Sequence, residues 1–263
     1  MSDRLRLHLL GIGGSGMLPL ALLLGQAGHA VSGSDDHCAP ARLARLVAQG
    51  IALSPGADPV RAGTVDRLVA SPAIPRSHPA LRAARRAGVA VSSRADELAA
   101  LIAGRRAVCV AGSHGKSTTT AMLLHILTAA GHGDFGYMLG ADFADPDQPP
   151  ARLGAADAPF VTEACEAHGA LDVWRPWRAI LTGLDDEHAD HYGGTEGLHR
   201  AFAAFLARVP AEGGLLVCGD DPVSADLLPR ARCPVLTYGL DPGNGLRGIR
   251  TGPASCKVDL HGE

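Results

Sequence analysis

Val108-Cys-Val-Ala-Gly-Ser-His-Gly-Lys-Ser-Thr-Thr-Thr120 is an apolar run that breaks into a glycine loop and leads into a helix. Val108 to Ala111 has the β-branched, apolar character of a buried parallel strand, and Ala121 to Ala130 is predicted to be helical. Gly112 and Gly115 let backbone N–H groups approach an anion, and the lysine that follows adds a positive charge where the helix begins. The stretch therefore predicts a phosphate-binding loop.

The loop is shorter than the usual G-x-x-x-x-G-K-[ST] sequence, because only two residues separate Gly112 from Gly115. A glycine turn before a Ser/Thr-capped helix is the alternative interpretation, since both residue types are common at helix starts. The lysine beside glycine favours phosphate, and the Ser117 hydroxyl could ligate Mg²⁺. The candidate residues for binding a nucleoside triphosphate are Gly112, Ser113, His114, Gly115, Lys116, Ser117 and Thr118.

A second glycine loop lies near the start of the chain. Leu5 to Leu10 is predicted to be a strand, Gly11-Ile-Gly-Gly-Ser-Gly16 matches G-x-G-x-x-G, and Met17 to Ala27 is predicted to be a helix. The strand His29 to Ser34 follows, and Asp35 stands 19 residues after Gly16, where a dinucleotide-binding fold places the carboxylate that holds a ribose. We expect ligand binding at this loop; a tight Rossmann-type turn without a ligand is the alternative.

The remaining chain alternates between predicted helices and strands, so we expect an α/β fold in two domains. Residues 1–104 would form a Rossmann-like domain and residues 105–263 a P-loop-type α/β domain. Residues 131–159 are rich in loop-forming residues and are predicted to lack regular structure. Further helices are predicted at 41–49, 79–87, 94–103, 198–208 and 223–228, and further strands at 67–70, 90–91, 159–163, 179–184, 215–218, 235–238 and 255–260.

Two acidic clusters follow predicted strands in the second half of the chain. Glu163 and Glu166 end one strand, and the segment 185–192 follows another. Carboxyl ends of parallel strands share one edge of a sheet, which is also where the phosphate loop lies. Hard cations take oxygen ligands, so Glu163 is the leading Mg²⁺ ligand beside Ser117, with His188 as a less ordinary one.

Other chemistry for these clusters is less favoured by the sequence. His188 could be a surface histidine at an acidic helix start, because acids are common there. Zinc ranks low, since His188 and His191 have no cysteine partner nearby. A nucleophilic role for Cys165 is disfavoured, because the neighbouring carboxylates would raise the pKa of its thiol.

Composition excludes several classes of protein. The chain has 263 residues, is 46% hydrophobic and carries a formal net charge of −3, which suits globular domains and gives no basic footprint for nucleic acid or an anionic membrane. Its six cysteines are scattered without a C-x-x-C pair, which favours reduced thiols. The first residues do not resemble a cleavable signal, so we expect a cytoplasmic location.

Several distinct motifs, in order, resemble those of the Mur ligase family. The resemblance covers nearly the whole chain and corresponds to the first two domains of the family. Its strongest element is Gly-Ser-His-Gly-Lys-Ser, which matches the family's own form of the phosphate loop. The stretches that carry the resemblance are His8–Met17, Ser32–Asp35, Ser71–Pro75, Ala111–Thr120, Glu163–Glu166, Asp186–Asp190 and Tyr238-Gly239.

The resemblance implies an ATP-dependent, ADP-forming ligase of peptidoglycan precursor synthesis. ATP would phosphorylate the carboxylate of a UDP-sugar acid such as UDP-N-acetylmuramate, and an amino acid would attack the acyl phosphate. Lys116, Glu163 and His188 would be catalytic. Ser117 and Glu163 would hold Mg²⁺, and His188 would serve a second magnesium near the acyl phosphate. The residues implied for the UDP-sugar, with Asp35 close to the uridine, are Gly11, Gly13, Gly14, Ser15, Gly16, Met17, Asp35 and Ser71.

The chain departs from the family pattern at several places. Ser117 stands where threonine is common, Thr182-Gly183 where Thr-Asn is common, and Ala167-His168 where acidic or aromatic residues often occur. Full-length members also carry a third domain that binds the amino acid and closes on ATP. We therefore expect this chain to be a poor ligase alone, unless a partner chain supplies that domain.

Two other functions stay open at this stage. One is a binding module that still captures a UDP-sugar and a nucleotide but forms no amide. The other is an NAD-dependent oxidoreductase, suggested by the first glycine loop and Asp35. The oxidoreductase hypothesis leaves residues 112–117 unexplained, and no hydride-transfer constellation follows in the sequence.

Overall fold

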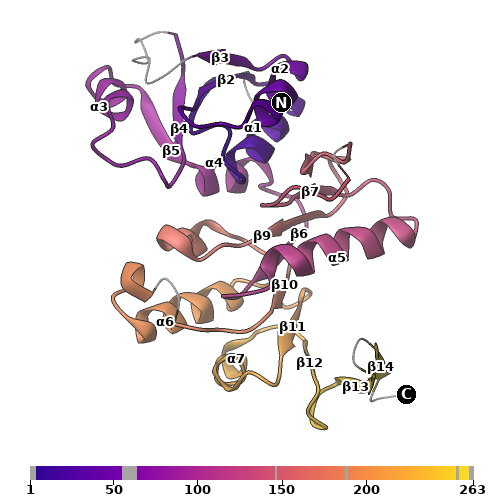
Figure 1. The fold of residues 1–263 in the computed structure, drawn as a ribbon. Helices are drawn as coiled ribbons and strands as arrows, with labels where there is room; N and C mark the ends of the chain where they lie inside the picture. The colour runs from indigo at the N-terminus through magenta and orange to yellow at the C-terminus, as the bar shows by residue number, and fades with distance from the viewer. Residues whose placement is uncertain (1–3, 55–63, 146, 187–188, 253–254, 261–263) are drawn as a thin grey trace. The chain divides into compact units, whose positions relative to one another are not determined.

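The chain folds into two compact units in the computed structural model, which describes residues 4–54, 64–145, 147–186, 189–252 and 255–260 (Figure 1). The first unit comprises Met1–Ala103 and Asp134–Ala156, and the second comprises Gly104–Gly133 and Asp157–Glu263. The expected α/β fold, with a Rossmann-like and a P-loop-type part, is confirmed. A single boundary after residue 104 does not describe these units, because residues 134–156 make their internal contacts with the first one.

A parallel sheet forms the centre of the first unit. Its strand order is β3-β2-β1-β4-β5, and every neighbouring pair is parallel. The order reverses direction between β1 and β4, which is the point at which open α/β sheets bind ligands. The strands are β1 (Arg6–Leu10), β2 (Ala30–Ser34), β3 (Ala52–Ser54), β4 (Arg67–Ala70) and β5 (Ala90–Ser93).

The helices of the first unit begin where the sequence supplies helix-start residues. Proline occupies the first turn of two of them, and a capping box of Ser93 and Asp96 starts a third. In helix α1 every residue from Met17 to Leu24 is buried, as expected for a helix that is apolar on all sides. The helices are α1 (Met17–Gln26), α2 (Pro40–Ala48), α3 (Pro79–Arg86) and α4 (Arg94–Leu101).

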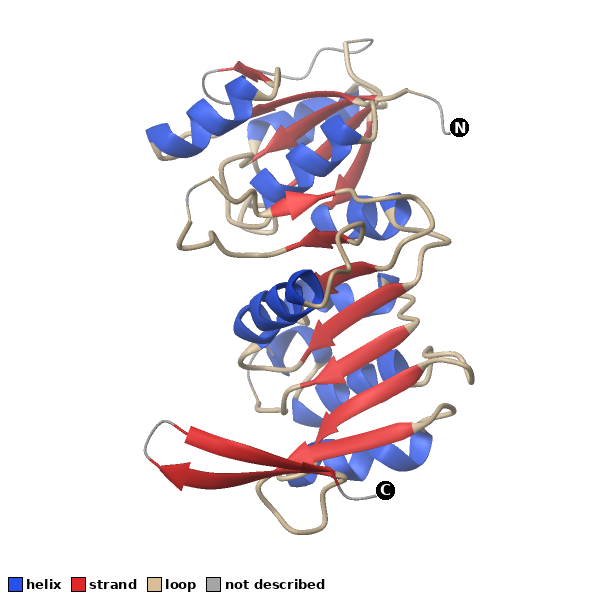
Figure 2. Ribbon diagram, turned by 90° about the vertical axis from the view of Figure 1, so that its right-hand side faces the viewer, coloured by secondary structure: helices blue, strands red, loops and turns tan. Residues whose placement is uncertain are grey.

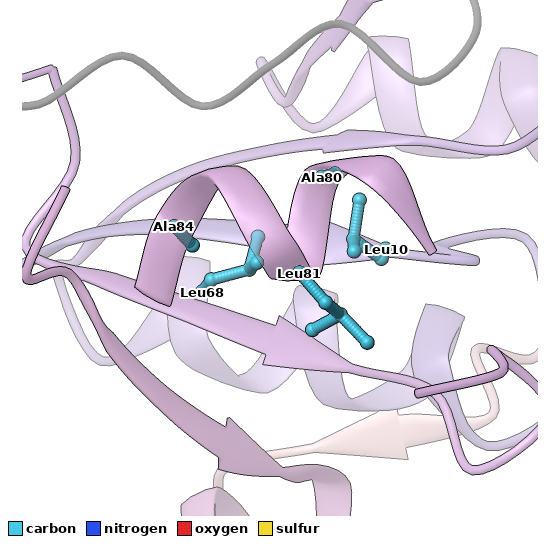
Figure 3. Packing of buried hydrophobic residues seen from close by; sticks show 5 residues of the cluster. All are labelled: Leu10, Leu68, Ala80, Leu81 and Ala84. Carbon is cyan, nitrogen blue, oxygen red and sulfur yellow. The ribbon is translucent and has the colours of Figure 1, made fainter. Parts of the chain in front are cut away.

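Helix α3 packs on the sheet beside the switch point. Figure 3 shows Ala80, Leu81 and Ala84 of α3 directed at Leu10 of β1 and Leu68 of β4. All five side chains are at most 3% exposed. This packing fixes the end of β1, from which the first glycine loop leaves the sheet.

Residues 134–156, predicted to be loop, contain two short strands instead. β7 (Gly136–Met138) and β8 (Ala151–Arg152) pair in antiparallel fashion. The Leu153 N–H donates to the Gln26 side chain of α1 over 2.7 Å. The sequence predicted a loop-rich segment and did not predict these strands, because strands of two or three residues leave no alternating pattern to detect.

The second unit also contains a mostly parallel sheet. Its strands run in the order β13-β12-β11-β10-β6-β9 with parallel pairing, and β14 adds to β13 in antiparallel fashion. Figure 2 shows these parallel strands as adjacent arrows with a common direction, backed by helices. The strands are β6 (Ala107–Ala111), β9 (Phe160–Glu163), β10 (Arg178–Leu181), β11 (Gly214–Cys218), β12 (Val235–Gly239), β13 (Leu246–Gly252) and β14 (Ser255–Leu260).

Helix α5 begins five residues earlier than the sequence predicts. It starts at Lys116 rather than Ala121, so the lysine and Ser117 belong to its first turn. The three threonines favoured a later start, because β-branched residues are poor helix formers. The helices of this unit are α5 (Lys116–Ala129), α6 (Thr195–Leu206) and α7 (Pro222–Leu227), and short 3-10 helices occupy Ala167–Val173, Ala189–Tyr192 and Leu228–Arg230.

Two further expectations concern the whole chain. None of the helices in the described part combines the length and the apolar character that crossing a bilayer requires. The cysteines whose side chains are described carry free thiols, namely Cys38, Cys109, Cys165, Cys218 and Cys233. Burial raises the pKa of the Cys109 thiol to about 12, so this thiol behaves as a small apolar core group.

Candidate functional site

The phosphate loop joins β6 to α5 in the second unit. Gly112 has φ +126°, and a side chain there would collide with Thr182 and with the Gly183 carbonyl oxygen. Gly115 has φ +77° and caps the helix N-terminus without a side chain. Both positions therefore need glycine, one for close packing against the end of β10 and both for their backbone conformation.

Hydrogen bonds fasten this loop to the segment that follows β10. The Ser113 N–H donates to the Gly183 carbonyl over 2.9 Å, and the Ser113 hydroxyl accepts from the Asp185 N–H over 2.8 Å. The Thr182 hydroxyl donates to the His114 carbonyl over 2.5 Å. The Ser113 side chain, predicted to bind phosphate, is thus occupied in holding the loop in shape.

Lys116 lies folded back into the loop from the first turn of α5. Its ammonium donates to the carbonyl oxygens of Gly112 and Ser113 over 2.6 and 2.9 Å, and to Glu166 Oε1 over 3.0 Å. Glu166 Oε2 also lies 3.0 Å from the same nitrogen. The lysine side chain is 13% exposed, so most of it is buried within the loop.

Glu166 and Thr182 contact the phosphate loop but were not among the site residues predicted from the sequence. The Glu166 side chain is only 1% exposed, and its backbone carbonyl accepts from the Tyr192 hydroxyl over 2.6 Å. Burial, with the negative charge of Glu166 nearby, raises the pKa of Tyr192 to about 12, so this hydroxyl stays a donor at neutral pH. The position of Glu166, three residues after Glu163 at the same strand end, was the available signal.

Ser117 and Glu163 form a pair of oxygen groups beside the loop. The Ser117 hydroxyl donates to Glu163 Oε2 over 2.9 Å from the adjacent strand β9. Hydroxyl and carboxylate oxygens are the ligands that Mg²⁺ prefers, so the chemistry of this pair fits that ion. Among the described residues there is no group of three or more His, Cys, Asp or Glu side chains placed around a metal site.

The remaining residues that were predicted to bind the nucleotide occupy varied positions. His114 is exposed, and its Nε2 lies 3.7 Å from Asp185 Oδ2. Thr118 is exposed on the first turn of α5. His188 and the neighbouring Glu187 lie outside the described residues, so the role expected of His188 stays a prediction.

The first glycine loop, between β1 and α1, is held by a backbone carbonyl, a carboxylate and a cation, since the Arg42 guanidinium donates to the Gly13 carbonyl over 2.9 Å. Gly11, with φ +73°, and Ile12 donate their N–H groups to the Ser34 carbonyl over 2.8 and 3.2 Å. The Gly13 N–H donates to Asp35 Oδ2 over 2.9 Å. Asp35, expected close to a uridine, therefore also braces the loop itself.

A cavity of about 270 Å³ opens beside this loop at the switch point of the sheet. Four of the predicted substrate residues line it: Gly11, Gly14, Asp35 and Ser71. The other four lie in the same loop or at the start of α1, with Ser15 exposed, Met17 buried and Gly16 packed against the Arg94 side chain. The sequence did not single out the lining residues Asp36, His37, Ile74 and His78.

Comparison with protein families gives two adjacent matches. The profile described as "Mur ligase family, catalytic domain" matches residues 6–106, and the profile described as "Mur ligase middle domain" matches residues 110–260. Together they cover both glycine loops and both acidic segments.

Individual proteins agree with these matches. The UDP-N-acetylmuramate–L-alanine ligase of Kineococcus radiotolerans is 43% identical over 97% of this chain and 52% of its own length. That of Rubrobacter xylanophilus is 37% identical over 95% of this chain and 55% of its own length. The crystal structure of the UDP-N-acetylmuramate:L-alanyl-gamma-D-glutamyl-meso-diaminopimelate ligase from Neisseria meningitides superposes with a TM-score of 0.86 at 25% identity, covering 98% of this chain and 85% of that one. The chain spans about half the length of the two ligases compared by sequence.

Proposed function

Because the chain belongs to the Mur ligase family, we propose that it provides the UDP-sugar-binding and ATP-binding parts of an ADP-forming amide ligase. The acid substrate would be UDP-N-acetylmuramate or a close relative, and the amine would be an amino acid, with L-alanine the first candidate. These substrates are those in the names of the similar ligases. The reaction would belong to peptidoglycan precursor synthesis in the cytoplasm.

The observation that carries this proposal is the arrangement around Lys116. A buried ammonium lies at the floor of a glycine loop, and the Ser117–Glu163 pair stands at the next strand end. The N-terminus of α5 directs its first-turn N–H groups toward the same loop. A cation, a helix N-terminus and an oxygen pair for Mg²⁺ are the parts that a nucleoside triphosphate requires.

We propose the following roles for residues of this chain. Lys116 donates to the β- and γ-phosphates and stabilises charge that develops as the γ-phosphoryl group moves to the substrate carboxylate. Ser117 and Glu163 would hold Mg²⁺, and His188 a second magnesium; these ions would supply positive charge to the phosphates. Gly112 and Gly115 keep the backbone close to the phosphates. Transfer of the γ-phosphoryl group would release ADP and form an acyl phosphate, and attack by the amino group would then yield the amide with release of inorganic phosphate and a proton.

The sugar nucleotide would occupy the cavity beside the first glycine loop. This cavity lies at the carboxyl end of β1, the place at which ligands bind in open α/β sheets. Its lining by Gly11, Gly14, Asp35 and Ser71 supports a polar ligand that approaches the backbone closely. The loop would face the diphosphate, and Asp35 would lie near the uridine.

Ligation would also need the part of the relatives that this chain does not match. We propose that a further segment, on the same protein or on a partner chain, binds the amino acid and closes over ATP. Closure would exclude water from the acyl phosphate, which is otherwise hydrolysed.

Phosphate release tests the proposed reaction directly. The protein is mixed with ATP·Mg²⁺, UDP-N-acetylmuramate and L-alanine, and each component is omitted in turn. Release that requires both the sugar acid and the amino acid supports ligation, and release that ignores either one contradicts it. Calorimetric titration with ATP·Mg²⁺ and with the UDP-sugar, each alone, measures the two binding steps.

A nucleotide- and UDP-sugar-binding module without ligase activity is the second candidate. The observation in its favour is that the Lys116 ammonium already donates to three acceptors of the protein itself. This candidate predicts that both ligands bind while no combination of substrates releases phosphate. Phosphate release that depends on the amino acid would rule it out.

A further inference from the structure

We infer that Glu166 is a positioning residue of the phosphate loop, a fixed counterion that keeps the Lys116 ammonium at the loop floor while a polyphosphate binds. The inference rests on the proposed binding of ATP, and it assigns a role to a carboxylate that the proposed mechanism does not use. Glu166 reaches the nucleotide only through the lysine.

The hydrogen-bonding capacity of the Lys116 ammonium is fully used. An ammonium group has three N–H donors, and here all three have acceptors: Gly112 O at 2.6 Å, Ser113 O at 2.9 Å and Glu166 Oε1 at 3.0 Å. A phosphate oxygen that takes a proton from Lys116 must therefore replace one of these acceptors. The effect of Glu166 on binding depends on which one is replaced.

The Glu166 carboxylate is buried beside Lys116. Its side chain is 1% exposed, and the Oε2 atom has no hydrogen bond within the described part of the chain, although it lies 3.0 Å from Lys116 Nζ. If the ammonium left, a buried carboxylate would lose its counterion, which costs far more than the loss of one neutral carbonyl contact. A phosphate should therefore replace a carbonyl of Gly112 or Ser113 and leave the ion pair intact.

The backbone around Glu166 is held by hydrogen bonds at two places. Its backbone carbonyl accepts from Tyr192, and the nearby Ala164 N–H donates to the Val110 carbonyl of β6 over 2.8 Å. The backbone that carries this carboxylate is thus attached both to the 3-10 segment of Tyr192 and to the strand that leads into the phosphate loop. Such a group can hold an ammonium in one place with little freedom to follow it.

Electrostatics then predict an unusual pair of effects for Glu166→Gln. Glutamine keeps an acceptor oxygen for Lys116 but removes a negative charge from the floor of a polyanion site. ATP·Mg²⁺ should bind about tenfold more tightly, since one like charge has gone. The protein should nevertheless be less stable, because the buried ammonium has lost its counterion. A carboxylate with a merely structural role would weaken both properties.

A double-mutant cycle tests the ion pair without any nucleotide. Wild type, Lys116→Met, Glu166→Gln and the double variant are unfolded in urea and followed by tryptophan fluorescence, since Trp174 and Trp177 both lie in the second unit. Glu212→Gln, at an exposed carboxylate of the same unit, is the matched control and should leave the unfolding midpoint unchanged. We expect the double variant to lose less than the sum of the single losses. Additive losses would overturn the inference.

Calorimetric titration with ATP·Mg²⁺ tests the positioning role. Glu166→Gln should bind more tightly than wild type, and Glu166→Leu, which offers no acceptor to Lys116, should bind more weakly than Glu166→Gln. Unchanged or weaker binding by Glu166→Gln would overturn the inference. A wild type that binds no ATP contradicts the proposed function instead, and the double-mutant cycle then decides alone whether Glu166 holds Lys116.

Discussion

The two glycine loops follow the same plan of strand, loop and helix, yet different charged side chains hold them in shape. In the loop after β1, backbone N–H groups of Gly11, Ile12 and Gly13 donate to the Ser34 carbonyl and the Asp35 carboxylate. In the loop after β6, backbone carbonyls of Gly112 and Ser113 accept from the Lys116 ammonium. The Gly13 carbonyl also accepts from the Arg42 guanidinium over 2.9 Å, so the first loop is braced by a carboxylate and a guanidinium, and the second by the lysine of its own helix.

This difference shows what a glycine motif can and cannot indicate. Glycine permits a close backbone approach and a positive φ, and both loops use these properties. The charged groups that contact each loop belong to residues other than its glycines, namely Asp35 and Arg42 in one case and the Lys116–Glu166 pair in the other. At each loop, a ligand must therefore compete with different charged side chains of the protein itself.

Replacing Lys116 with alanine should give the largest separation between the loops. ATP·Mg²⁺ affinity should fall about 100-fold, because a charge-assisted hydrogen bond to phosphate is lost. UDP-sugar affinity should stay within about twofold, since the two loops belong to different units. Calorimetric titration of both ligands measures the two values. Equal losses for both would show that the loops do not work independently.

Alanine at the most crowded glycine of each loop should come next. Gly112→Ala would collide with Thr182 and Gly183, and Gly13→Ala would collide with the Cys38 side chain. Each change should cost about 2 kcal/mol of unfolding free energy, as for overpacked cores, and should act on its own unit. Tryptophan fluorescence reports the second unit, and hydrogen exchange of peptides from residues 4–34 reports the first.

Two glycines with open surroundings serve as controls for those variants. An added side chain would meet nothing within 4 Å at Gly133 or at Gly25. Gly133→Ala should be neutral, and Gly25→Ala, within α1, should stabilise by about 0.5–1 kcal/mol. If Gly13→Ala lowered the stability of the second unit as much as that of the first, the assignment of one loop to each unit would fail.

Removing the anionic brace of the first loop should have a smaller effect. Asp35→Ala frees the N–H groups of Gly13 and His37, which donate to its carboxylate over 2.9 Å each. The loss should be about 1 kcal/mol, or about fivefold in UDP-sugar affinity, because the site is partly solvated. Asp35→Asn retains an acceptor oxygen and should lose less. Calorimetry that shows tighter UDP-sugar binding by Asp35→Ala would mean that the carboxylate competes with the ligand.

The smallest effect is expected for the conservative change Ser117→Thr. Ser117→Thr keeps the hydroxyl near Glu163 and should change ATP·Mg²⁺ affinity by less than about twofold. Ser117→Ala should weaken it about tenfold, since one oxygen ligand of Mg²⁺ is lost. Titrations at several Mg²⁺ concentrations separate the two variants. If threonine were as damaging as alanine, the hydroxyl would not be the group that matters.

The sequence predicted the cores of the two loops because they combine signals of different kinds. The apolar strand before each loop, the glycines within it and the helix after it together indicate one local structure. Boundaries were less predictable, as the early start of α5 at Lys116 shows. The short strands β7 and β8 were missed because two or three residues carry no periodic pattern.

The contacts within the candidate site depend on distance in space more than on motifs. Glu163 could be placed near Ser117 by reasoning about strand ends, and the structure has them 2.9 Å apart. Glu166 could not be assigned to Lys116, because nothing local shows which of two neighbouring carboxylates turns inward. The bonds from Thr182 and Asp185 to the loop likewise join residues about 70 positions apart.

The division into two units also bears on the order in which their residues leave the ribosome during synthesis. The first unit includes residues 134–156, which emerge only after β6, the phosphate loop and α5. Its chain is therefore complete only after part of the second unit has left the ribosome. The backbone also crosses between the units three times, after residues 103, 133 and 156. A single proteolytic cut would therefore leave the two units covalently joined.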